Sequence, residues 1–344
     1  MTDLRHHGDA ELGAGLVDFA VNVRRTAPPV WLADRLRARI DGLAAYPDPA
    51  SATARIAAAH GISPESALPT AGGAEAFTLV ATALRPRHPV VVHPQFTEPE
   101  HALRATGHDV DRVVLSADDG FALDARAVPE AADLVVVGNP TNPTGTLHPA
   151  DLLRALARPG RVLVVDEAFM DALPDETESL AYGENSGIVV IRSLTKTWGI
   201  AGLRAGYVVG DREIIGRLAV VQPHWSVSAL ALEAIEACLE DSARAAAAAD
   251  ALSIIDDRRY LEDGLRRRGF RVHPSHAPFV LADTSTQMSR SDPMYVWNAL
   301  REQGYAVRRC DTFPGLDGRW LRIAVRDREI VDGLLRAWDV VSGG

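Results

Sequence analysis

Short apolar runs alternate with helical stretches between about residues 85 and 210 of the chain. Most of these runs are rich in valine and carry no polar residue at alternate positions, which is typical of strands buried on both faces. Strands of this kind, separated by helices, predict a mostly parallel sheet that is sandwiched between helices. The expected strands are 89–92, 110–115, 134–137, 162–165, 188–191 and 205–209.

The rest of the chain follows other patterns. Residues 228–268 are expected to form a long interdomain helix with a break near Asp241, and the tail is expected to form a small α+β domain. The first 45 residues show little sheet pattern and are expected to form an arm and a helix over 29–42. We therefore predict an α/β fold in three parts, which are 1–45, a large domain over 46–228, and 229–344. The predicted tail strands are 270–272, 279–282, 305–308 and 321–325, and the predicted tail helices are 293–303 and 328–340.

Composition and charge narrow the class of protein. The chain has 344 residues, of which 47% are hydrophobic, and its net charge of −10 argues against nucleic-acid binding. We find no apolar run long enough to span a membrane and no signal sequence, so a cytoplasmic location is expected. No metal site is expected, because Cys238, Cys310, His6, His7 and His101 all lack the spacing of metal ligands.

Lys196 is the only lysine in the chain, and the other 35 of its 36 basic residues are arginines. Arginine can replace lysine as a charge, but it cannot replace lysine as an amine nucleophile, because its guanidinium stays protonated. A lone lysine therefore suggests covalent chemistry with a carbonyl group, although chance survival on the surface explains the count equally well.

Polar residues that follow the predicted strands are candidates for a site, since parallel sheets bind ligands beyond the carboxyl ends of their strands. Asn142 lies in a rigid turn, Asn-Pro-Thr-Asn-Pro-Thr-Gly, that would present its amide as a fixed donor. Asp166 ends an apolar strand, where a carboxylate is costly unless it is paired, and a heterocyclic N–H⁺ would be a suitable partner. The plainer interpretations are a simple turn for Asn142 and a helix cap for Asp166.

Two further segments are suited to binding a phosphate. Ser193, Thr195 and Arg204 surround Lys196 with hydroxyl and guanidinium donors, although no P-loop motif is present. Gly72 and Gly73 precede a predicted helix, whose first amides would be free to bind an anion. An amine, a carboxylate, an amide donor and a phosphate-binding turn are together the groups that pyridoxal phosphate requires.

On these motifs the chain resembles the fold-type I pyridoxal-phosphate enzymes of the class I/II aminotransferase superfamily over nearly its whole length. It is similar to the histidinol-phosphate aminotransferases, and most similar to the actinobacterial threonine-phosphate decarboxylases of cobalamin biosynthesis. The narrower likeness rests on the segments 166–171, 191–198 and 201–204.

The resemblance implies roles for single residues. Lys196 would be the catalytic residue that bonds to the cofactor, and Asp166 would pair with the pyridine nitrogen. Asn142 would donate to the phenolic oxygen, and Phe96 would stack on the ring. The other implied cofactor ligands hold the phosphate: Gly73, Ala74, Glu75, Ser193, Thr195, Arg204, and Tyr46 from the second subunit of a homodimer.

The resemblance also implies a substrate pocket formed by Asn22, Arg322, Arg326 and Trp225, with Arg322 clamping a carboxylate. Phe96 and Tyr46 could instead be packing residues, and Asn22 could be a turn residue. Three segments depart from the aminotransferase pattern. Phe169 replaces a tyrosine, the arm has Arg24 and Arg25 in place of the last two residues of the usual Asn-x-Asn-Pro, and Gly72 replaces an asparagine.

The expected activity is decarboxylation of L-threonine O-3-phosphate to (R)-1-aminopropan-2-yl phosphate for cobalamin biosynthesis. The alternative is an aminotransferase that acts on histidinol phosphate or another amino acid. Arg24, Arg25 and Arg326 are candidates for binding the substrate phosphate. The α/β pattern is also compatible with a regulatory cofactor-binding protein without catalysis. A nicotinamide oxidoreductase would need a Gly-x-Gly-x-x-Gly motif after the first strand, and this motif is missing.

Overall fold

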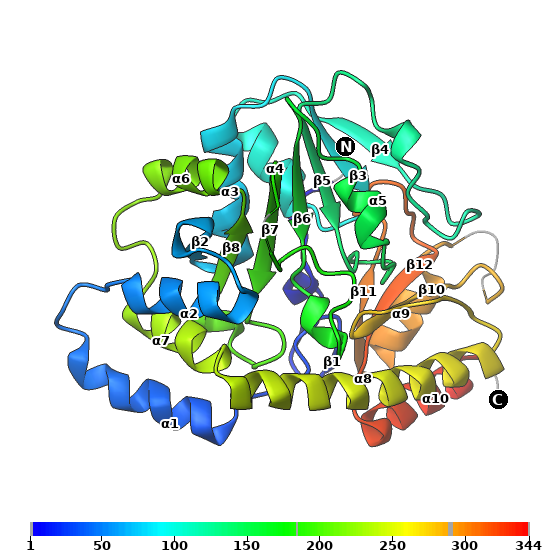
Figure 1. Ribbon diagram of the computed structural model, residues 1–344. Helices are drawn as coiled ribbons and strands as arrows, with labels where there is room; N and C mark the ends of the chain where they lie inside the picture. Colours follow the sequence, from blue (N-terminus) through cyan, green and yellow to red (C-terminus); the bar gives the residue numbers. More distant parts are fainter. Residues whose placement is uncertain (1–2, 184, 288–291, 343–344) are drawn as a thin grey trace.

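The computed structural model describes residues 3–183, 185–287 and 292–342. Within them the chain forms two sheets (Figure 1). The larger sheet has the strand order β2-β8-β7-β6-β5-β3-β4, and only β8 runs antiparallel to its neighbours. This topology confirms the predicted mostly parallel α/β sheet. Its strands are β2 (Ala67–Thr70), β3 (Pro89–His93), β4 (Asp111–Val114), β5 (Leu134–Gly138), β6 (Val162–Asp166), β7 (Ile188–Ser193) and β8 (Gly206–Gly210).

Both faces of the larger sheet are buried under helices, which explains its valine-rich strands. In β3, Val90 and Val92 lie in the core on one side of the sheet, whereas Val91 lies in the core on the other side. One face is covered by α3 (Gly72–Leu84), α4 (Glu98–Ala105) and α6 (Arg212–Val221). The other is covered by α1 (Val30–Arg39), α2 (Ala50–His60), α5 (Ala150–Arg154) and α7 (Ala229–Cys238).

The second sheet has the strand order β1-β11-β12-β10-β9 and packs against the helices of the tail. Its strand β1 comes from the N-terminal segment and pairs in parallel with β11. The expectation of little sheet in the first 45 residues therefore missed a strand, because three residues are too few to show a period. The strands are β1 (Val17–Phe19), β9 (Arg271–His273), β10 (Phe279–Asp283), β11 (Tyr305–Arg309) and β12 (Trp320–Ala324), and the helices are α9 (Tyr295–Glu302) and α10 (Arg328–Ser342).

Helix α8 (Asp241–Arg267) runs beneath both sheets (Figure 1). Its Ala243 lies in the core of the larger sheet, and its Leu261 and Leu265 lie in the core of the smaller one. The break between α7 and α8 falls near Asp241, as the sequence predicts. The domain boundaries at residues 45 and 228 stay predictions; by packing, α7 belongs with the larger sheet.

Short 3-10 helices complete the chain, and the larger sheet has one strand that the sequence did not predict. The unpredicted strand is β2, a four-residue edge strand that contains Pro69, a residue more typical of turns than of strands. The 3-10 helices are η1 (Gly8–Glu11), η2 (Ile40–Gly42), η3 (Pro64–Ser66), η4 (Ala125–Ala127), η5 (Met170–Ala172) and η6 (Ala201–Leu203).

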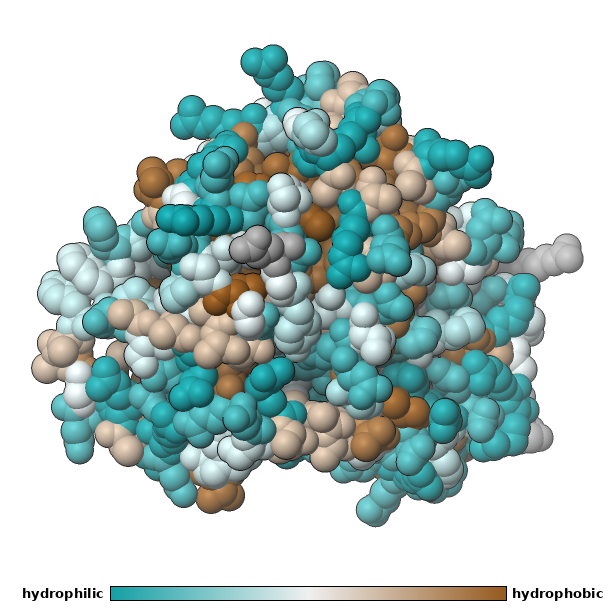
Figure 2. Space-filling view, viewed as in Figure 1, coloured by the Kyte–Doolittle hydropathy of each residue, from teal (hydrophilic) through white to brown (hydrophobic). Residues whose placement is uncertain are grey.

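Hydrophilic side chains cover most of the face seen in Figure 2, with apolar ones scattered between them. In the part of the chain that the structure describes, no helix combines the length and the apolar character that crossing a bilayer requires.

Candidate active site

The predicted polar residues meet at the carboxyl ends of three neighbouring strands. Asp166 is the last residue of β6, Ser193 is the last residue of β7, and Asn142 lies in the turn that follows β5. Because β5, β6 and β7 are parallel and adjacent, their carboxyl ends lie along one edge of the sheet. The parallel sheet thus brings residues that are far apart in the sequence together in one site.

Arg204 and the start of α3 form a cup of donors. Arg204 has a left-handed backbone conformation (φ 58°), and its guanidinium lies against Gly72, where an added Cβ would be 2.6 Å from Nη2. Gly72 itself has φ 75°, so both the conformation and the close approach require glycine. The amides of Gly73 and Ala74 lie in the first turn of α3, where amides have no helical partner.

The resemblance implied that Glu75 holds the cofactor phosphate, but in the structure its side chain binds a backbone amide at the start of α3. Its carboxylate accepts a hydrogen bond from the Ala71 amide at 2.5 Å and closes the start of the helix. Its own N–H is placed for the helical bond to the Ala71 carbonyl. Gly73 and Ala74 are therefore better placed than Glu75 to bind a phosphate through the backbone.

The hydroxyl groups of Ser193 and Thr195 are 2.8 Å apart and are both buried. Each hydroxyl has one hydrogen to donate, and one of them is used in this contact. An anion that bound here would take up the other hydrogen. The pair therefore extends the cup formed by Arg204 and α3.

Asp166 is a buried carboxylate with little compensation. Its Oδ1 accepts a hydrogen bond from the Ala168 amide at 3.1 Å. Burial raises the pKa of Asp166 to about 6, against the opposing effects of that amide and of the positive charge on Lys196. A cationic N–H donor beside Asp166 would favour its ionised form, and the protonated pyridine nitrogen of the expected cofactor would be such a donor.

The Lys196 amine is poised to react. Burial lowers its pKa to about 8, and the positive charges of Arg204 and Arg322 act in the same direction. A lower pKa leaves a larger fraction of the amine neutral at neutral pH, and only the neutral amine attacks a carbonyl. This supports the interpretation of the lone lysine as a nucleophile over chance survival on the surface.

Asn142 and Arg322 are joined across the two sheets. The Asn142 Oδ1 accepts a hydrogen bond from Arg322 Nη1 at 2.5 Å, which leaves the Asn142 Nδ2 free to donate. Arg322 also donates to the carbonyl of Ala20 and lies 5.4 Å over the ring of Phe279. Burial lowers the pKa of Arg322 to about 9, and its Nε has no partner among the described residues. A buried guanidinium with a free N–H is suited to an anionic group of a substrate.

A cavity of about 730 Å³ opens beside Lys196, between the N-terminal arm and α8. Asn22 lines it, and its buried Oδ1 has no partner within the described ranges. Arg326 also lines it and is held by the carbonyls of Asp18 and Val21. Two of the four predicted substrate residues thus border the cavity that holds the lysine, whereas Arg322 and Trp225 do not line it.

The other two arginines proposed for a substrate phosphate are already paired. Arg24 contacts Asp257 and Asp327, and Arg25 contacts Asp250. Both line the cavity, but these carboxylates compete for their guanidinium groups. Arg322 keeps a free Nε–H among the described residues, although it is not one of the residues that line this cavity.

Phe96 is half-buried, with its ring 6.4 Å from Phe77 and 5.3 Å from His7. The position of His7 is unexpected, because no pattern in the sequence places the first residues near the site. Gly8 lies against the Ala20 carbonyl, and the negative charge of Asp9 acts against the lowering of the Lys196 pKa that burial causes. Sequence reasoning therefore missed the segment around η1 as part of the site.

The N-terminal segment is brought to the site by a buried ion pair. Arg308 Nη1 lies 3.2 Å from the Glu11 carboxylate, and the His6 Nε2 lies 2.9 Å from the same carboxylate. Arg301 donates to the Glu11 carbonyl. Sequence patterns do not reveal a pairing between residues about 300 positions apart, so no signal could have located this segment.

Phe169, Tyr46 and Trp225 lie around the site in different ways. Phe169 lines the cavity and packs edge-on against Phe279, with ring centres 5.1 Å apart, and it brings no hydroxyl group. Tyr46 and Trp225 stack on each other with ring centres 4.3 Å apart, and they are 75% and 58% exposed. Neither lines the cavity beside Lys196, where Trp225 was expected, whereas Tyr46 was expected to reach the site of a second subunit.

The arrangement fits pyridoxal phosphate at each of its polar groups. Lys196 offers the amine, Asp166 the acceptor for the ring nitrogen, Asn142 the amide donor, and the cup at Arg204 the phosphate ligands. Among the described residues no group of three or more histidine, cysteine, aspartate or glutamate side chains could hold a metal ion.

Comparisons with known proteins agree with this interpretation. A family model described as aminotransferase class I and II matches residues 11–337. The chain is 47% identical over 325 residues to a Mycobacterium tuberculosis protein described as a histidinol-phosphate aminotransferase, covering 94% of this chain and 87% of that one. It is 34% identical over 333 residues to the threonine-phosphate decarboxylase of Salmonella typhimurium, covering 94% and 90%. The crystal structure of the histidinol-phosphate aminotransferase from Clostridium acetobutylicum has the same fold, with a TM-score of 0.86, 24% identity, and coverage of 95% of this chain and 99% of that one.

Replacing Asp166 by asparagine is expected to stabilise the cofactor-free protein in a pH-dependent way. The pKa of Asp166 is raised from 3.8 to about 6 in the folded state, so ionising it opposes folding. The penalty is absent below about pH 4, grows as the pH rises to about 6, and then levels at about 2–3 kcal/mol. Urea unfolding at pH 4 and pH 8 should show the gain in the free energy of unfolding at pH 8 alone.

Asp124→Asn is the matched control, because the pKa of the exposed Asp124 is lowered by its hydrogen bond to Arg126. This control should give no gain at either pH. An equal free energy of unfolding for Asp166→Asn and the unchanged protein at pH 8 would contradict the description of Asp166 as an uncompensated buried charge.

Proposed function

The chain belongs to the class I and II aminotransferases, which depend on pyridoxal phosphate, and we propose that it transfers the amino group of a phosphorylated substrate. Histidinol phosphate is the proposed amino donor. The observation that carries this proposal is the 47% identity, over 94% of the chain, to a protein described as a histidinol-phosphate aminotransferase.

The site residues support amino-group chemistry. When bound, pyridoxal phosphate supplies a ring that accepts electrons from a bond broken at the substrate carbon. Asp166 would keep the ring nitrogen protonated, and Asn142 would hold the phenolic oxygen through its free Nδ2. Lys196 would move a proton at the substrate Cα, a role suited to an amine with a pKa of about 8.

Recognition of a phosphorylated substrate is assigned to Arg322 and the residues around it. Arg322 has a free Nε, and Asn22 has a free Oδ1, within the part of the chain that is described. The guanidinium would bind the anionic group, and the amide oxygen would accept a hydrogen bond from a substrate donor. The N-terminal arm lines the cavity beside Lys196 and would help to exclude water from the reacting atoms.

Decarboxylation of L-threonine O-3-phosphate is the second candidate, and one observation at the site favours it. Phe169 stands where histidinol-phosphate aminotransferases usually have a tyrosine, so one hydroxyl donor is missing beside the expected phenolic oxygen. The 34% identity to the threonine-phosphate decarboxylase of Salmonella typhimurium supports the same candidate. Both reactions would use Lys196, Asp166 and Arg322, and they differ in which substrate bond is held perpendicular to the ring.

A substrate test without any keto acid separates the two reactions. With histidinol phosphate, an aminotransferase should change the cofactor absorbance once and recover it only after 2-oxoglutarate or another keto acid is added. With L-threonine O-3-phosphate, a decarboxylase should release carbon dioxide over many turnovers. The proposed transfer predicts the first result, whereas sustained release of carbon dioxide would replace it by decarboxylation.

We further propose a homodimer in which Tyr46 and Trp225 complete the site of the partner subunit. Their stacked rings are exposed, and exposed apolar side chains are also found nearby in the chain at Val30 and Trp31 of α1. Trp225 has a left-handed backbone conformation (φ 59°), so the loop holds its ring outward at a conformational cost. A ring held outward in this way is suited to a contact with a second subunit.

Mixing two inactive variants tests the shared site. Tyr46→Ala lacks the proposed partner contribution and Lys196→Ala lacks the amine, so each homodimer should be inactive or nearly so. A mixed dimer would contain one complete site, and about a quarter of the unmixed wild-type activity should return after subunit exchange.

The matching control mixes Asn142→Ala with Lys196→Ala. Both residues belong to the same site of one protomer, so each site of a mixed dimer would lack one of them. This mixture should therefore stay inactive. No recovery from the Tyr46 and Lys196 mixture, although mixed dimers are present by mass spectrometry, would show that Tyr46 does not act across the interface.

A further inference from the structure

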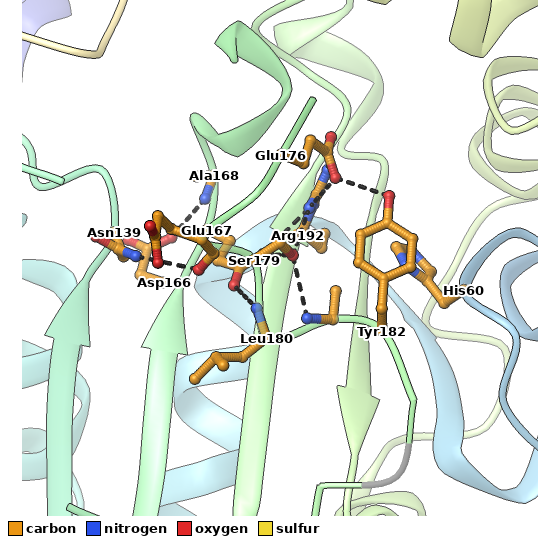
Figure 3. Close-up of polar contacts among 12 residues, drawn as sticks. His60, Asn139, Asp166, Glu167, Ala168, Glu176, Ser179, Leu180, Tyr182 and Arg192 are labelled. Carbon is orange, nitrogen blue, oxygen red and sulfur yellow. Dashed lines mark hydrogen bonds and ion pairs between the residues drawn. The ribbon is translucent and has the colours of Figure 1, made fainter. Parts of the chain in front are cut away.

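A buried ion network lies at the ends of β6 and β7 (Figure 3). At its centre is Arg192 of β7, which is only 7% exposed. Its Nη1 lies 3.1 Å from the Glu167 carboxylate and 3.0 Å from Glu176, and its Nη2 lies 2.6 Å from Glu176. One guanidinium thus joins two carboxylates from separate segments.

The two carboxylates are themselves held by further bonds. Glu167 accepts hydrogen bonds from the Ser179 hydroxyl at 2.6 Å and from the Leu180 amide at 2.7 Å. Glu176 accepts one from the Tyr182 hydroxyl at 2.9 Å. The network therefore fastens the loop that follows η5 to the ends of β6 and β7, as Figure 3 shows.

Strand geometry connects this network to the cofactor groups. Asp166 and Glu167 are consecutive residues at the end of β6, and Arg192 and Ser193 are consecutive at the end of β7. Side chains alternate along a strand, and Asp166 pairs with Ile191 in register. Asp166 and Ser193 thus share one face, while Glu167 and Arg192 share the opposite face.

One further hydrogen bond extends the pairing of β6 and β7 beyond Asp166. The Glu167 amide donates to the Ile191 carbonyl at 2.9 Å. A shift of Glu167 or Arg192 would consequently move the residue beside it. The relative position of the Asp166 carboxylate and the Ser193 hydroxyl depends on the pairing on the other face.

Burial and ion pairing have opposite effects on the charged groups of the network. Burial raises the pKa of Glu167, against the effect of Arg192. Burial would also raise the pKa of Glu176, but Arg192 and the hydrogen bonds outweigh it and the pKa is lowered. Burial likewise opposes the charge on Arg192, whose pKa the carboxylates nevertheless hold well above the usual range.

Buried ion pairs contribute little net stability, because the cost of removing charges from water offsets their attraction. Their best supported use is to specify one arrangement among several. We propose that Arg192 is a positioning residue, which holds the ends of β6 and β7 so that Asp166 and the hydroxyls at Ser193 and Thr195 grip the same cofactor molecule. This proposal depends on the cofactor of the family and is independent of which phosphorylated substrate reacts.

Cofactor binding to the apo protein tests the proposal without any substrate. Arg192→Gln should raise the dissociation constant for pyridoxal phosphate by about 10- to 100-fold, by analogy with the loss of metal affinity when residues that orient metal ligands are replaced. At saturating cofactor, the circular dichroism of its visible band should also change, because the ring is held differently.

A double variant distinguishes an effect on the positioning of the cofactor from an effect on the stability of the fold. Arg192→Gln leaves two buried carboxylates without a cation, and adding Glu176→Gln removes one of them. The double variant should regain stability in urea unfolding and yet keep the raised dissociation constant and the altered dichroism. Recovery of the affinity together with the stability would overturn the proposal, as would an unchanged dissociation constant in Arg192→Gln.

Arg161 provides a matched control at the other end of β6. It is buried and donates to the carbonyls of Ala132, Pro129 and Glu130, away from the strand ends that carry the site. Arg161→Gln should lower the free energy of unfolding without changing the dissociation constant for the cofactor. An equal rise in that constant in this control would show that general destabilisation, and not positioning, explains the effect of Arg192.

If Arg192→Gln does not fold, Arg192→Lys decides the question. Lysine keeps the charge but not the planar fork that contacts two carboxylates at once. The proposal expects a raised dissociation constant and altered dichroism, and unchanged values for both would contradict it. Either result leaves the test with the two phosphorylated substrates unaffected.

Discussion

The burial of one carboxylate, Asp166, is the constraint from which the rest of the site follows. A carboxylate at the end of an apolar strand opposes folding unless a cation is placed beside it. Within the described chain its only compensation is the Ala168 amide and the more distant charge of Lys196, and its pKa is accordingly raised to about 6. The fold thus maintains a position that is unfavourable alone and becomes favourable when a protonated ring nitrogen is bound.

The parallel sheet places other polar groups beside Asp166. It aligns the ends of β5, β6 and β7, so the amide of Asn142, the carboxylate of Asp166 and the hydroxyl of Ser193 come from consecutive strands to one edge. The antiparallel strand β8 then begins just after Arg204, whose guanidinium returns to the start of α3 at Gly72. The second sheet contributes Arg322, so the proposed substrate ligand Arg322 and the proposed cofactor ligand Asn142 are joined by a hydrogen bond.

Site residues that directly follow strands could be predicted, because the carboxyl ends of parallel strands lie along one edge of the sheet. Asn142 and Asp166 were identified in this way, and the strands before them lie where their valine-rich runs are, whereas Lys196 was identified as the only lysine of the chain. Residues brought together by distant pairing could not be predicted. The arm at His7 and Asp9 depends on the pair between Glu11 and Arg308, which no local pattern encodes.

The Arg192 network was missed for a different reason. Its residues are adjacent in sequence to predicted site residues, but the sequence does not show that their side chains converge on the opposite face. Tyr46 and Trp225 show another limit, since the structure brings their exposed rings together outside the cavity of their own protomer. A role for them needs a second subunit, which one chain does not contain.

The central claim is that the single lysine of this chain is the point at which the cofactor is attached. The most direct measurement is borohydride reduction of the protein loaded with pyridoxal phosphate, followed by mass spectrometry of its peptides. The account predicts one cofactor mass per chain, fixed to the peptide that contains Lys196. A cofactor mass found on the N-terminal amine, or none on the Lys196 peptide of a fully loaded protein, would contradict it.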